Sequence, residues 1–532
     1  MEPYAKLAAT LSARGFKPVD LDAWTFQGSL KVEQYTVRVE LRVRGLNFVN
    51  LPIATLLDDG GLPAETIAHL DETGICYAAP GTLLLDQYEP GKSILRVLEC
   101  IQETLRESVK GGTPGAVLTE FPLYWHGERI YRCESEDQNL VMCIDTVSAK
   151  KHGIMVRPDM AEQKPRFEKV ADVKKVLVDR MITPPTKPER ENLKGILDWL
   201  RRQGIEPDEE LWGAIVDRKL IWIVSNNGEV GFCVDSQSLI GRIPAGNRNA
   251  RVWKQHLARI NVHRFIVEAA DASSIVLRNL NDTPSLLGKN VLVLGCGTVG
   301  GFVASLLNRS GAGVGGKLAL IDNQTLTSGN LGRHLLPFDY VGLGKSASLK
   351  QELLRSIPGA EILALKADAV EYFNNKAAGF DLVIDTLGDE VTSVALNHML
   401  QDKRKLGFKI ACIHGWVWDN GISVQALLNQ EGGACFKCLR PRIEEPWRHD
   451  PRKDVTAIPT IVSPRCGDGA FTPFSASASM AAASLVNKLA LEWAGGIQGS
   501  ILESIGLDYS KVKNNERRKL FPYDGCPACD PR

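Results

Sequence analysis

The sequence predicts an α/β protein that ends in a doubly wound parallel sheet and begins with a smaller α+β domain. From residue 289 onwards, buried-strand runs alternate with helical stretches, which is typical of βαβ units. Earlier, residues 32–43 alternate apolar and polar side chains, and residues 93–109 repeat apolar positions at helical spacing. We therefore expect an N-terminal domain at 1–130, a linker or connecting domain at 131–254 and a C-terminal domain at 255–532.

The composition is that of a globular chain. The 532 residues carry 63 Lys+Arg and 63 Asp+Glu, so the formal net charge is zero and nucleic acid is not an expected partner. A charge-free run at 469–487 is too rich in small and polar residues to predict a membrane span. Since the N-terminus also lacks the apolar core of a signal peptide, we expect a cytoplasmic protein with reduced thiols.

The region between the two outer domains carries no chemical signature. Residues 150–190 are rich in Lys, Arg, Glu and Pro, which predicts a linker. A helix and short strand-like runs follow at 191–245, and we expect this stretch to have a structural role.

A glycine motif opens the C-terminal domain. Gly295, Gly297 and Gly300 follow a predicted strand at 290–294 and stand at the start of a helix. Glycines permit a tight turn and close backbone approach, and a helix N-terminus offers free N–H groups to phosphate. Asp322 ends the next predicted strand, where a carboxylate can bind ribose hydroxyls. The motif predicts a nucleotide site but does not separate NAD from ATP.

Charged residues downstream favour ATP. Arg333 and Lys345 follow Asp322, and a triphosphate needs more cationic partners than a dinucleotide. Asp385 ends a later strand, and Asp389 lies four residues beyond it. Either carboxylate could hold Mg²⁺ against the phosphates, so both stay candidates.

In this order the residues resemble those of the ThiF/MoeB and ubiquitin-activating adenylation family, over about 255–532. The resemblance implies a Rossmann-like adenylation domain that uses ATP and Mg²⁺, with Asp322 on the ribose. It also implies that Asn330, Arg333 and Lys345 bind the phosphates. Two positions depart from the family pattern, because Gln324 replaces a second acidic residue and Gly388 stands where a metal-binding Asp is frequent.

The same resemblance implies a homodimer. In the family, an arginine that precedes the glycine motif often reaches the phosphates across the dimer. Arg278 is our candidate for this role, and Arg264 is the second choice.

Two CxxC pairs predict a structural zinc site. Cys435 and Cys438 form one pair, and Cys526 and Cys529 form the other. Four thiolates on two tight turns make a closed tetrahedral Zn²⁺ site. Redox-active pairs are the alternative, but a redox CxxC normally opens a helix in a thioredoxin-like unit. The resembled family carries the same two knuckles.

A single cysteine, Cys466, lies between these pairs. Its segment, 458–469, is rich in Pro and Gly, and Arg465 and a following helix would favour the thiolate. In the resembled family, a cysteine on this loop receives the activated carboxylate as a thioester, which implies this role for Cys466.

A second candidate nucleophile, Cys76, lies after the N-terminal strands and before the long helix. The segment Gly74-Ile75-Cys76 resembles the active-site stretch of ubiquitin-conjugating enzymes. The usual His-Pro-Asn is missing, and His69 is a possible substitute for its oxyanion role. Two cysteines would then form two stations for one acyl group.

The domain order resembles the fused transferase family of CBASS, a bacterial antiphage signalling system. There the activated protein is a neighbouring cyclic-nucleotide synthase (CD-NTase), whose C-terminus is attached to cellular targets. The resemblance implies a partner with a C-terminal glycine and a target-protein amine as acceptor. The alternatives are an enzyme for a separate ubiquitin-like protein, a sulfur-carrier adenylyltransferase, an NAD-dependent oxidoreductase and a non-catalytic binding protein.

Overall fold

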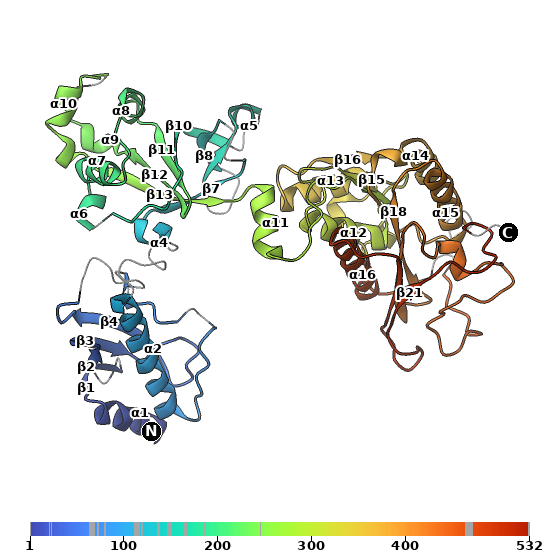
Figure 1. The fold of residues 1–532 in the computed structure, drawn as a ribbon, viewed down its shortest axis with the longest axis horizontal. Coiled ribbons are helices and arrows are strands. Elements are labelled where there is room, and N and C mark those ends of the chain that lie inside the picture. Colours follow the sequence, from blue (N-terminus) through green and yellow to red (C-terminus); the bar gives the residue numbers. More distant parts are fainter. Residues whose placement is uncertain are drawn as a thin grey trace. The chain divides into compact units, whose positions relative to one another are not determined.

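The computed structural model describes residues 2–20, 22, 24–62, 70–71, 74–78, 81–110, 118, 121–135, 139–145, 152–163, 167–185, 187–244, 246–462 and 472–529 (Figure 1). Contacts divide the chain into two compact units. One consists of Met1–Arg132 and Glu136–Glu268, and the other of Cys133–Ser135 and Ala269–Arg532. Among the described residues, no helix has both the length and the apolar character that a membrane crossing requires.

The N-terminal part of the first unit is an antiparallel meander with two helices. The run 32–43, in which apolar and polar residues alternate, belongs to two strands. It includes the end of β2 and the whole of β3, because Val32 and Tyr35 pair across a tight turn between them. The helices α1 and α2 pack on this sheet around a core that includes Leu7, Val37 and Ile101. The elements are α1 (Glu2–Ala13), β1 (Lys17–Asp20), β2 (Thr25–Val32), β3 (Tyr35–Arg42), β4 (Ile53–Asp58), β5 (Leu70–Asp71), β6 (Gly74–Ile75) and α2 (Pro90–Lys110).

A closed barrel makes up the rest of the first unit, with strand order β10-β11-β12-β13-β7-β9-β8. Its strands are β7 (Glu128–Arg132), β8 (Val141–Asp145), β9 (His152–Val156), β10 (Phe167–Val178), β11 (Leu220–Ser225), β12 (Gly228–Val234) and β13 (Val262–Ala269). Its helices are α4 (Phe121–Trp125), α5 (Pro158–Gln163), α6 (Lys187–Arg190), α7 (Leu193–Arg202), α8 (Glu209–Val216), α9 (Ser236–Leu239) and α10 (Ala250–Lys254).

The linker predicted at 150–190 is wrong over much of its length, because β9, α5 and β10 lie there. The charged residues of β10 are exposed or half-buried, and they mask the apolar alternation of a barrel strand. At the other end of the connecting region, β13 pairs with β12 and so belongs to the barrel. The expected domain boundaries stay a prediction.

The second unit contains an eight-stranded sheet of order β16-β15-β14-β17-β18-β19-β20-β21. The strands from β16 to β18 are parallel, and those from β18 to β21 are antiparallel. The strands are β14 (Val291–Leu294), β15 (Leu318–Ile321), β16 (Ile362–Leu365), β17 (Leu382–Asp385), β18 (Ala411–Trp418), β19 (Ser423–Asn429), β20 (Ser500–Gly506) and β21 (Glu516–Leu520).

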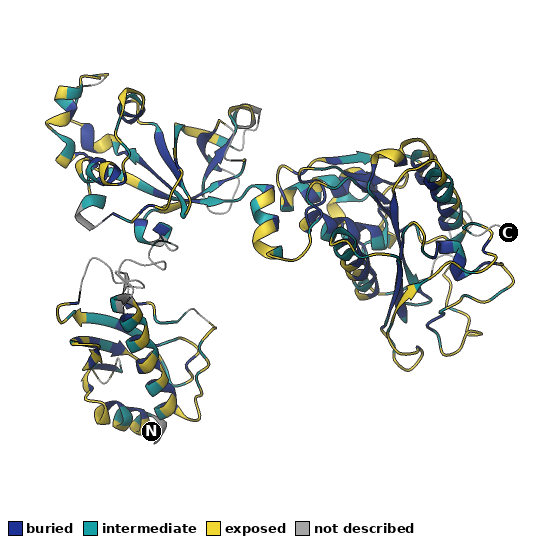
Figure 2. Ribbon diagram, in the orientation of Figure 1, coloured by how far each residue is buried: buried dark blue, intermediate teal, exposed yellow. Residues whose placement is uncertain are grey.

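Helices cover both faces of this sheet, as the doubly wound prediction requires. Val291 and Val293 of β14 pack with α12 and α16, whereas Leu292 and Leu294 pack with α14 and α15. The central strands β14, β15 and β17 are therefore buried on both faces (Figure 2). The helices are α11 (Ala272–Leu280), α12 (Thr298–Arg309), α13 (Lys345–Ser356), α14 (Ala369–Lys376), α15 (Glu390–Lys405) and α16 (Ala476–Ala494).

Candidate nucleotide site, cysteine cluster and acyl-transfer cysteines

The glycine loop joins β14 to α12 in a conformation that requires glycine. Gly295 has a φ of 88°, in the left-handed region. A Cβ on Gly300 would lie 1.8 Å from the carbonyl oxygen of Gly295 and 2.7 Å from Oγ1 of Thr386. Gly297 is the N-cap of α12, and no side chain caps that helix. The first turn of α12 can therefore offer backbone N–H groups to an anion.

Asp322 is fixed at the carboxyl end of β15, directly beside this loop. It is 9% exposed; its Oδ2 accepts from the Cys296 N–H at 2.7 Å, and its Oδ1 accepts from the Gln324 N–H at 2.7 Å. Asp322 lines a pocket with an empty volume of about 770 Å³, together with Gly295, Gly297 and Asp389. Ligand pockets typically have volumes of roughly 300–1,000 Å³. The pocket lies at the carboxyl ends of parallel strands, where doubly wound sheets bind ligands.

Gln324, which departs from the family pattern, links Lys345 to Asp322. Lys345 is the first residue of α13 and is only 4% exposed. Its Nζ donates to Oε1 of Gln324 at 2.7 Å, and burial lowers the pKa of its ammonium while Asp322 partly opposes this. The Gln324 amide thus holds Lys345 without neutralising its charge.

The side chain of Arg333, from the segment after the 3-10 helix at Ser328–Asn330, reaches the first residue of α12. Its Nε donates to Oγ1 of Thr298 at 3.2 Å, and its guanidinium lies over the Phe474 ring, 5.7 Å from the centroid. Burial lowers its pKa, as expected for a partly desolvated cation. The structure therefore brings Arg333 to the glycine loop, although Arg333 lies 33 positions after Gly300 in the sequence.

His334 is a positioning residue that the sequence analysis did not identify. It is buried, its Nδ1 accepts from the Leu336 N–H at 3.0 Å, and its Nε2 lies 2.9 Å from the Cys296 carbonyl oxygen. Since Nδ1 is an acceptor, the ring proton is on Nε2, which donates to the glycine loop. Burial lowers the pKa of His334, which favours this neutral form. In the sequence, the only feature that could have indicated this role of His334 is its position next to Arg333.

Two other predicted phosphate ligands have local partners. Asn330 ends a short 3-10 helix, Ser328–Asn330, and its Oδ1 accepts from the N–H and the hydroxyl of Thr327, at 3.0 Å each. Arg278 is exposed in the last turn of α11 and donates to the Ala269 carbonyl at 3.0 Å. Arg264, the second candidate, lies on β13 in the barrel and donates to the Trp125 carbonyl.

The two candidate magnesium ligands differ in their surroundings. Asp385 is 2% exposed; its Oδ2 lies 2.8 Å from Nδ1 of His414, and its Oδ1 accepts from the Leu387 N–H at 3.2 Å. Burial lowers the pKa of His414, but Cys412 and the Asp385 carboxylate outweigh this and raise it to about 10. Asp389 caps α15, and hydrogen bonds from Thr392 lower its pKa. Asp389 lines the nucleotide pocket, whereas Asp385 lines a neighbouring cavity.

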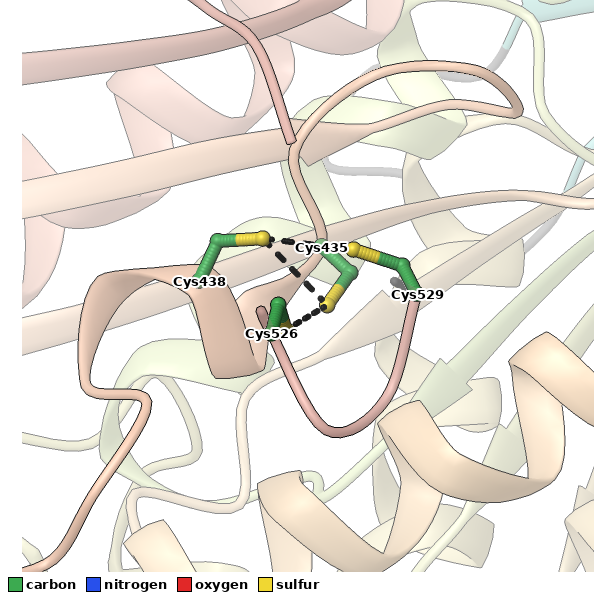
Figure 3. Close-up of side chains that lie close together, drawn as sticks. All are labelled: Cys435, Cys438, Cys526 and Cys529. Atoms are coloured by element: carbon green, nitrogen blue, oxygen red, sulfur yellow. Dashed lines mark hydrogen bonds between the residues drawn. The ribbon is translucent and has the colours of Figure 1, made fainter. Parts of the chain in front are cut away.

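The four predicted zinc ligands come together (Figure 3). Their sulfur atoms all lie within 4.8 Å of one another, and the Cys435–Cys438, Cys435–Cys526 and Cys438–Cys529 separations are 3.8, 3.8 and 3.4 Å. Zn–S bonds of about 2.3 Å in a tetrahedron require sulfur separations of about 3.8 Å. The four thiols hydrogen-bond one another, which lowers the pKa values of Cys438 and Cys526 and raises those of Cys435 and Cys529. A metal ion binds such cysteines as thiolates and displaces their protons. The cluster fits Zn²⁺.

Surrounding groups orient these sulfur atoms. Asn397 Nδ2 lies 3.6 Å from the Cys435 sulfur, and the Tyr523 N–H lies 3.4 Å from the Cys438 sulfur. Such outer contacts fix the direction of metal ligands.

Cys76 is exposed directly after β6. A Cβ on Gly74 would lie 2.4 Å from the Ala54 carbonyl oxygen, so β6 lies tightly against β4. On the other side, Tyr77 donates its hydroxyl to the Pro52 carbonyl at 2.7 Å, and burial raises the Tyr77 pKa. The thiol therefore lies between two anchored residues. Cys466, Arg465 and His69 lie outside the described residues.

Comparison with known proteins agrees with both halves of this description. Residues 275–520 match the ThiF family, and residues 3–130 match the Prokaryotic E2 family B. The ATP-dependent ubiquitin transferase-like protein Cap2 of Pseudomonas aeruginosa is 30% identical over 516 residues, which cover 91% of this chain and 88% of that protein. The chain belongs to the Cap2 family. It is thus an ATP-dependent ubiquitin transferase-like enzyme, which confirms the predicted adenylation and conjugating halves.

Other relatives cover less of the chain. Cap2 of Vibrio cholerae is 26% identical over 329 residues, which cover 57% of this chain and 52% of that protein. A crystal structure of E. coli MccB with ATP covers 48% of this chain and 69% of its own, at 17% identity and a TM-score of 0.34. Cap2-family membership fixes the enzyme class, and the roles of individual residues stay predictions.

Proposed function

We propose that this Cap2-family enzyme activates the C-terminal carboxylate of a partner protein with ATP and passes the acyl group through Cys466 and Cys76 to a target amine. The observation that supports this most is the pocket that Asp322 and the glycine loop form at the carboxyl edge of the sheet.

In the first step, a carboxylate oxygen of the partner attacks the α-phosphorus of ATP. The bond from that phosphorus to the bridging oxygen breaks, and pyrophosphate leaves with the electron pair. Asp322 would bind the ribose, while the α12 N-terminus, Asn330, Arg333 and Lys345 would bind the phosphates. Mg²⁺ would neutralise phosphate charge there. Asp389 is the better candidate to hold it, because Asp389 lines the nucleotide pocket, whereas Asp385 is buried against His414.

Two thioesters and an amide follow. The Cys466 thiolate attacks the acyl-adenylate carbonyl and AMP leaves. The Cys76 thiolate then attacks the Cys466 thioester and releases the Cys466 thiolate. A target amine attacks the Cys76 thioester, loses a proton and gives an amide, and the Cys76 thiolate leaves. The exposure of Cys76 supports this order, since its partners must reach the thiol. Zn²⁺ on the four clustered cysteines would be structural, because four protein ligands leave no open position.

The partner that we propose is a cyclic-nucleotide synthase with a C-terminal glycine, in cytoplasmic antiphage defence. The fusion of an adenylation half to a conjugating half supports this reading over a sulfur-carrier enzyme, which needs no Cys76. A separate ubiquitin-like protein is the alternative donor. We also propose that a homodimer brings Arg278 of one copy to the phosphates of the other.

The test is donor-dependent exchange of labelled pyrophosphate into ATP. The purified enzyme is given either the neighbouring synthase or a Gly-ended ubiquitin-like protein. Asp322→Ala should abolish exchange, whereas Asp339→Ala, in an exposed turn, should retain it. Cys466→Ala should retain exchange but form no thiol-sensitive adduct, and Cys76→Ala should stop at the Cys466 adduct. Full ligation with both cysteines replaced would refute the proposal.

A further inference from the structure

Arg404 is a buried cation that the proposed reaction steps do not use. It lies in the last turn of α15 and is 8% exposed. Its guanidinium donates to the Ile410 carbonyl oxygen, to the Asn429 carbonyl oxygen and to Oδ1 of Asn429, each at 2.8 Å. All three acceptors are neutral, so these hydrogen bonds hold the charge of Arg404 without cancelling it. Because a buried charge is costly unless an opposite charge is near, this arrangement points to a negative charge in the same region.

Two buried amides connect Arg404 to the four-cysteine cluster. Asn429 ends β19 and is fully buried, and Asn397, on α15, is 1% exposed. Nδ2 of Asn429 donates to Oδ1 of Asn397 at 3.1 Å, and Nδ2 of Asn397 lies 3.6 Å from the sulfur of Cys435. Arg404, Asn429 and Asn397 thus form an unbroken run of buried hydrogen bonds, which we call the buried relay, and it ends on a predicted zinc ligand.

The direction of the buried relay is fixed by groups that can only donate. An arginine side chain has no acceptor, so Asn429 turns its oxygen to Arg404 and its NH₂ group to Asn397. The backbone N–H of Phe436 also donates to Oδ1 of Asn397, at 3.0 Å. Asn397 therefore turns its own NH₂ group to Cys435, and the sulfur is the acceptor at the end of the relay.

An acceptor sulfur at this place is what a metal site requires. Cys435 is one of the four clustered cysteines in Figure 3, and a metal binds such residues as thiolates. Four thiolates outweigh the charge of one Zn²⁺, so the loaded cluster is anionic. A hydrogen bond to a thiolate, with a positive charge behind it, stabilises that anion. Burial lowers the pKa of Arg404, and the negative charges that oppose this include those of Cys435 and Cys529.

We propose that the buried relay positions the Cys435 thiolate and raises the affinity of the cluster for Zn²⁺. Asn397 supplies the hydrogen bond to the sulfur, Asn429 orients Asn397, and Arg404 polarises both amides. All three are positioning residues, because they act on the metal through Cys435. The inference depends on the zinc assignment and not on the proposed acyl transfer, so the two can fail separately.

A spectroscopic experiment tests the hydrogen bond to the sulfur. Full-length enzyme is prepared with Co²⁺ in place of Zn²⁺, because the visible bands of Co²⁺ report its geometry and its charge-transfer band reports the thiolates. Asn397→Asp keeps an acceptor oxygen for the Phe436 N–H but loses the N–H donor to the sulfur. We expect its charge-transfer band to move to longer wavelength, since the sulfur lone pair is less stabilised, while the visible bands stay in place. A merely structural role would not move this band. His398→Gln, at the exposed neighbouring position of α15, should have the wild-type spectrum.

A competition experiment with a zinc chelator then measures the affinity of the full-length enzyme for Zn²⁺. Loss of an outer contact typically lowers metal affinity about 10- to 100-fold, and we expect about tenfold for both Asn397→Asp and Arg404→Met. Arg404→Lys, which retains the charge, should bind Zn²⁺ more tightly than Arg404→Met. Lys405→Met removes an exposed charge one residue away and should bind Zn²⁺ as the wild type does.

Two results would overturn the inference. One is an Asn397→Asp enzyme whose charge-transfer band and zinc affinity both match the wild type. The other is a zinc affinity that falls equally in Arg404→Met and Lys405→Met, which would mean that net charge rather than the buried relay matters. Asn397→Asp conserves the size of the side chain and its acceptor oxygen, so it decides the matter if Arg404→Met does not fold.

Discussion

Replacing Gly300 by alanine should damage the nucleotide site by a calculable amount. The new Cβ would lie 1.8 Å from the Gly295 carbonyl oxygen, whereas ordinary contacts begin near 3.4 Å. Either the loop or the first turn of α12 must therefore move by about 1.5 Å. The new Cβ would meet the Gly295 carbonyl oxygen, which is a backbone atom, and the Thr386 hydroxyl. That hydroxyl is itself held by the backbone, because Thr386 Oγ1 donates to the Gly295 carbonyl at 2.8 Å. The displacement cannot be absorbed by a flexible side chain.

We expect this change to lower the free energy of unfolding of the C-terminal unit by about 2–3 kcal/mol. Because a misplacement of about 1 Å can cost about a hundredfold in rate, pyrophosphate exchange should fall by about that factor. Thermal melting and exchange measure the two effects. The control is Gly379→Ala, since a Cβ there meets nothing within 4 Å. If Gly300→Ala melts with the wild type and retains its exchange rate, the packing argument is wrong.

Three further predictions concern the cysteines and the buried histidine. Cys438→Ser should contain no zinc in elemental analysis and should melt at a lower temperature. The control Cys233→Ser, in the barrel, should retain the metal. An equal zinc content in both variants would contradict the cluster assignment. Tyr77→Phe loses the hydrogen bond to Pro52, worth about 1 kcal/mol, and should slow transfer to Cys76 without changing pyrophosphate exchange, while the exposed Tyr88→Phe should be neutral. Burial lowers the pKa of His334, so the stabilising contribution of the neutral ring is present above its unfolded pKa near 6.5 and is lost as the pH falls through the lower folded pKa. ATP affinity should fall over the same pH range, and it should fall less in His334→Gln. An ATP affinity of the wild type that does not change with pH would disprove this prediction.

Local patterns in the sequence predicted the framework of the site. The glycine motif, Asp322 and the paired cysteines are each recognisable within a few residues, because a tight turn or a knuckle is a local structure. The barrel strands were missed for the opposite reason. Lys and Glu on the outer side of β10 made residues 167–178 look like a linker, although their pairing with β8 and β11 makes them a strand.

The remaining contacts of the site join residues that are far apart in the sequence and meet only in the folded domain. Lys345 meets Gln324, and His414 meets Asp385, across separations of 21 and 29 residues. No spacing rule connects such pairs, because each contact forms only when distant strands and helices come together in the folded domain. The sequence could therefore name Asp385 and Asp389 as candidate magnesium ligands but could not rank them.

The four-cysteine cluster also constrains the entropy of the polypeptide. Cys438 and Cys526 lie at the two ends of one long stretch of chain, and the stretch includes position 466. A metal ion that joins both ends would close a large loop, and its binding free energy would offset the entropy lost when that loop closes on folding. The stretch that contains Cys466, our proposed nucleophile, therefore begins and ends at the same four-cysteine cluster.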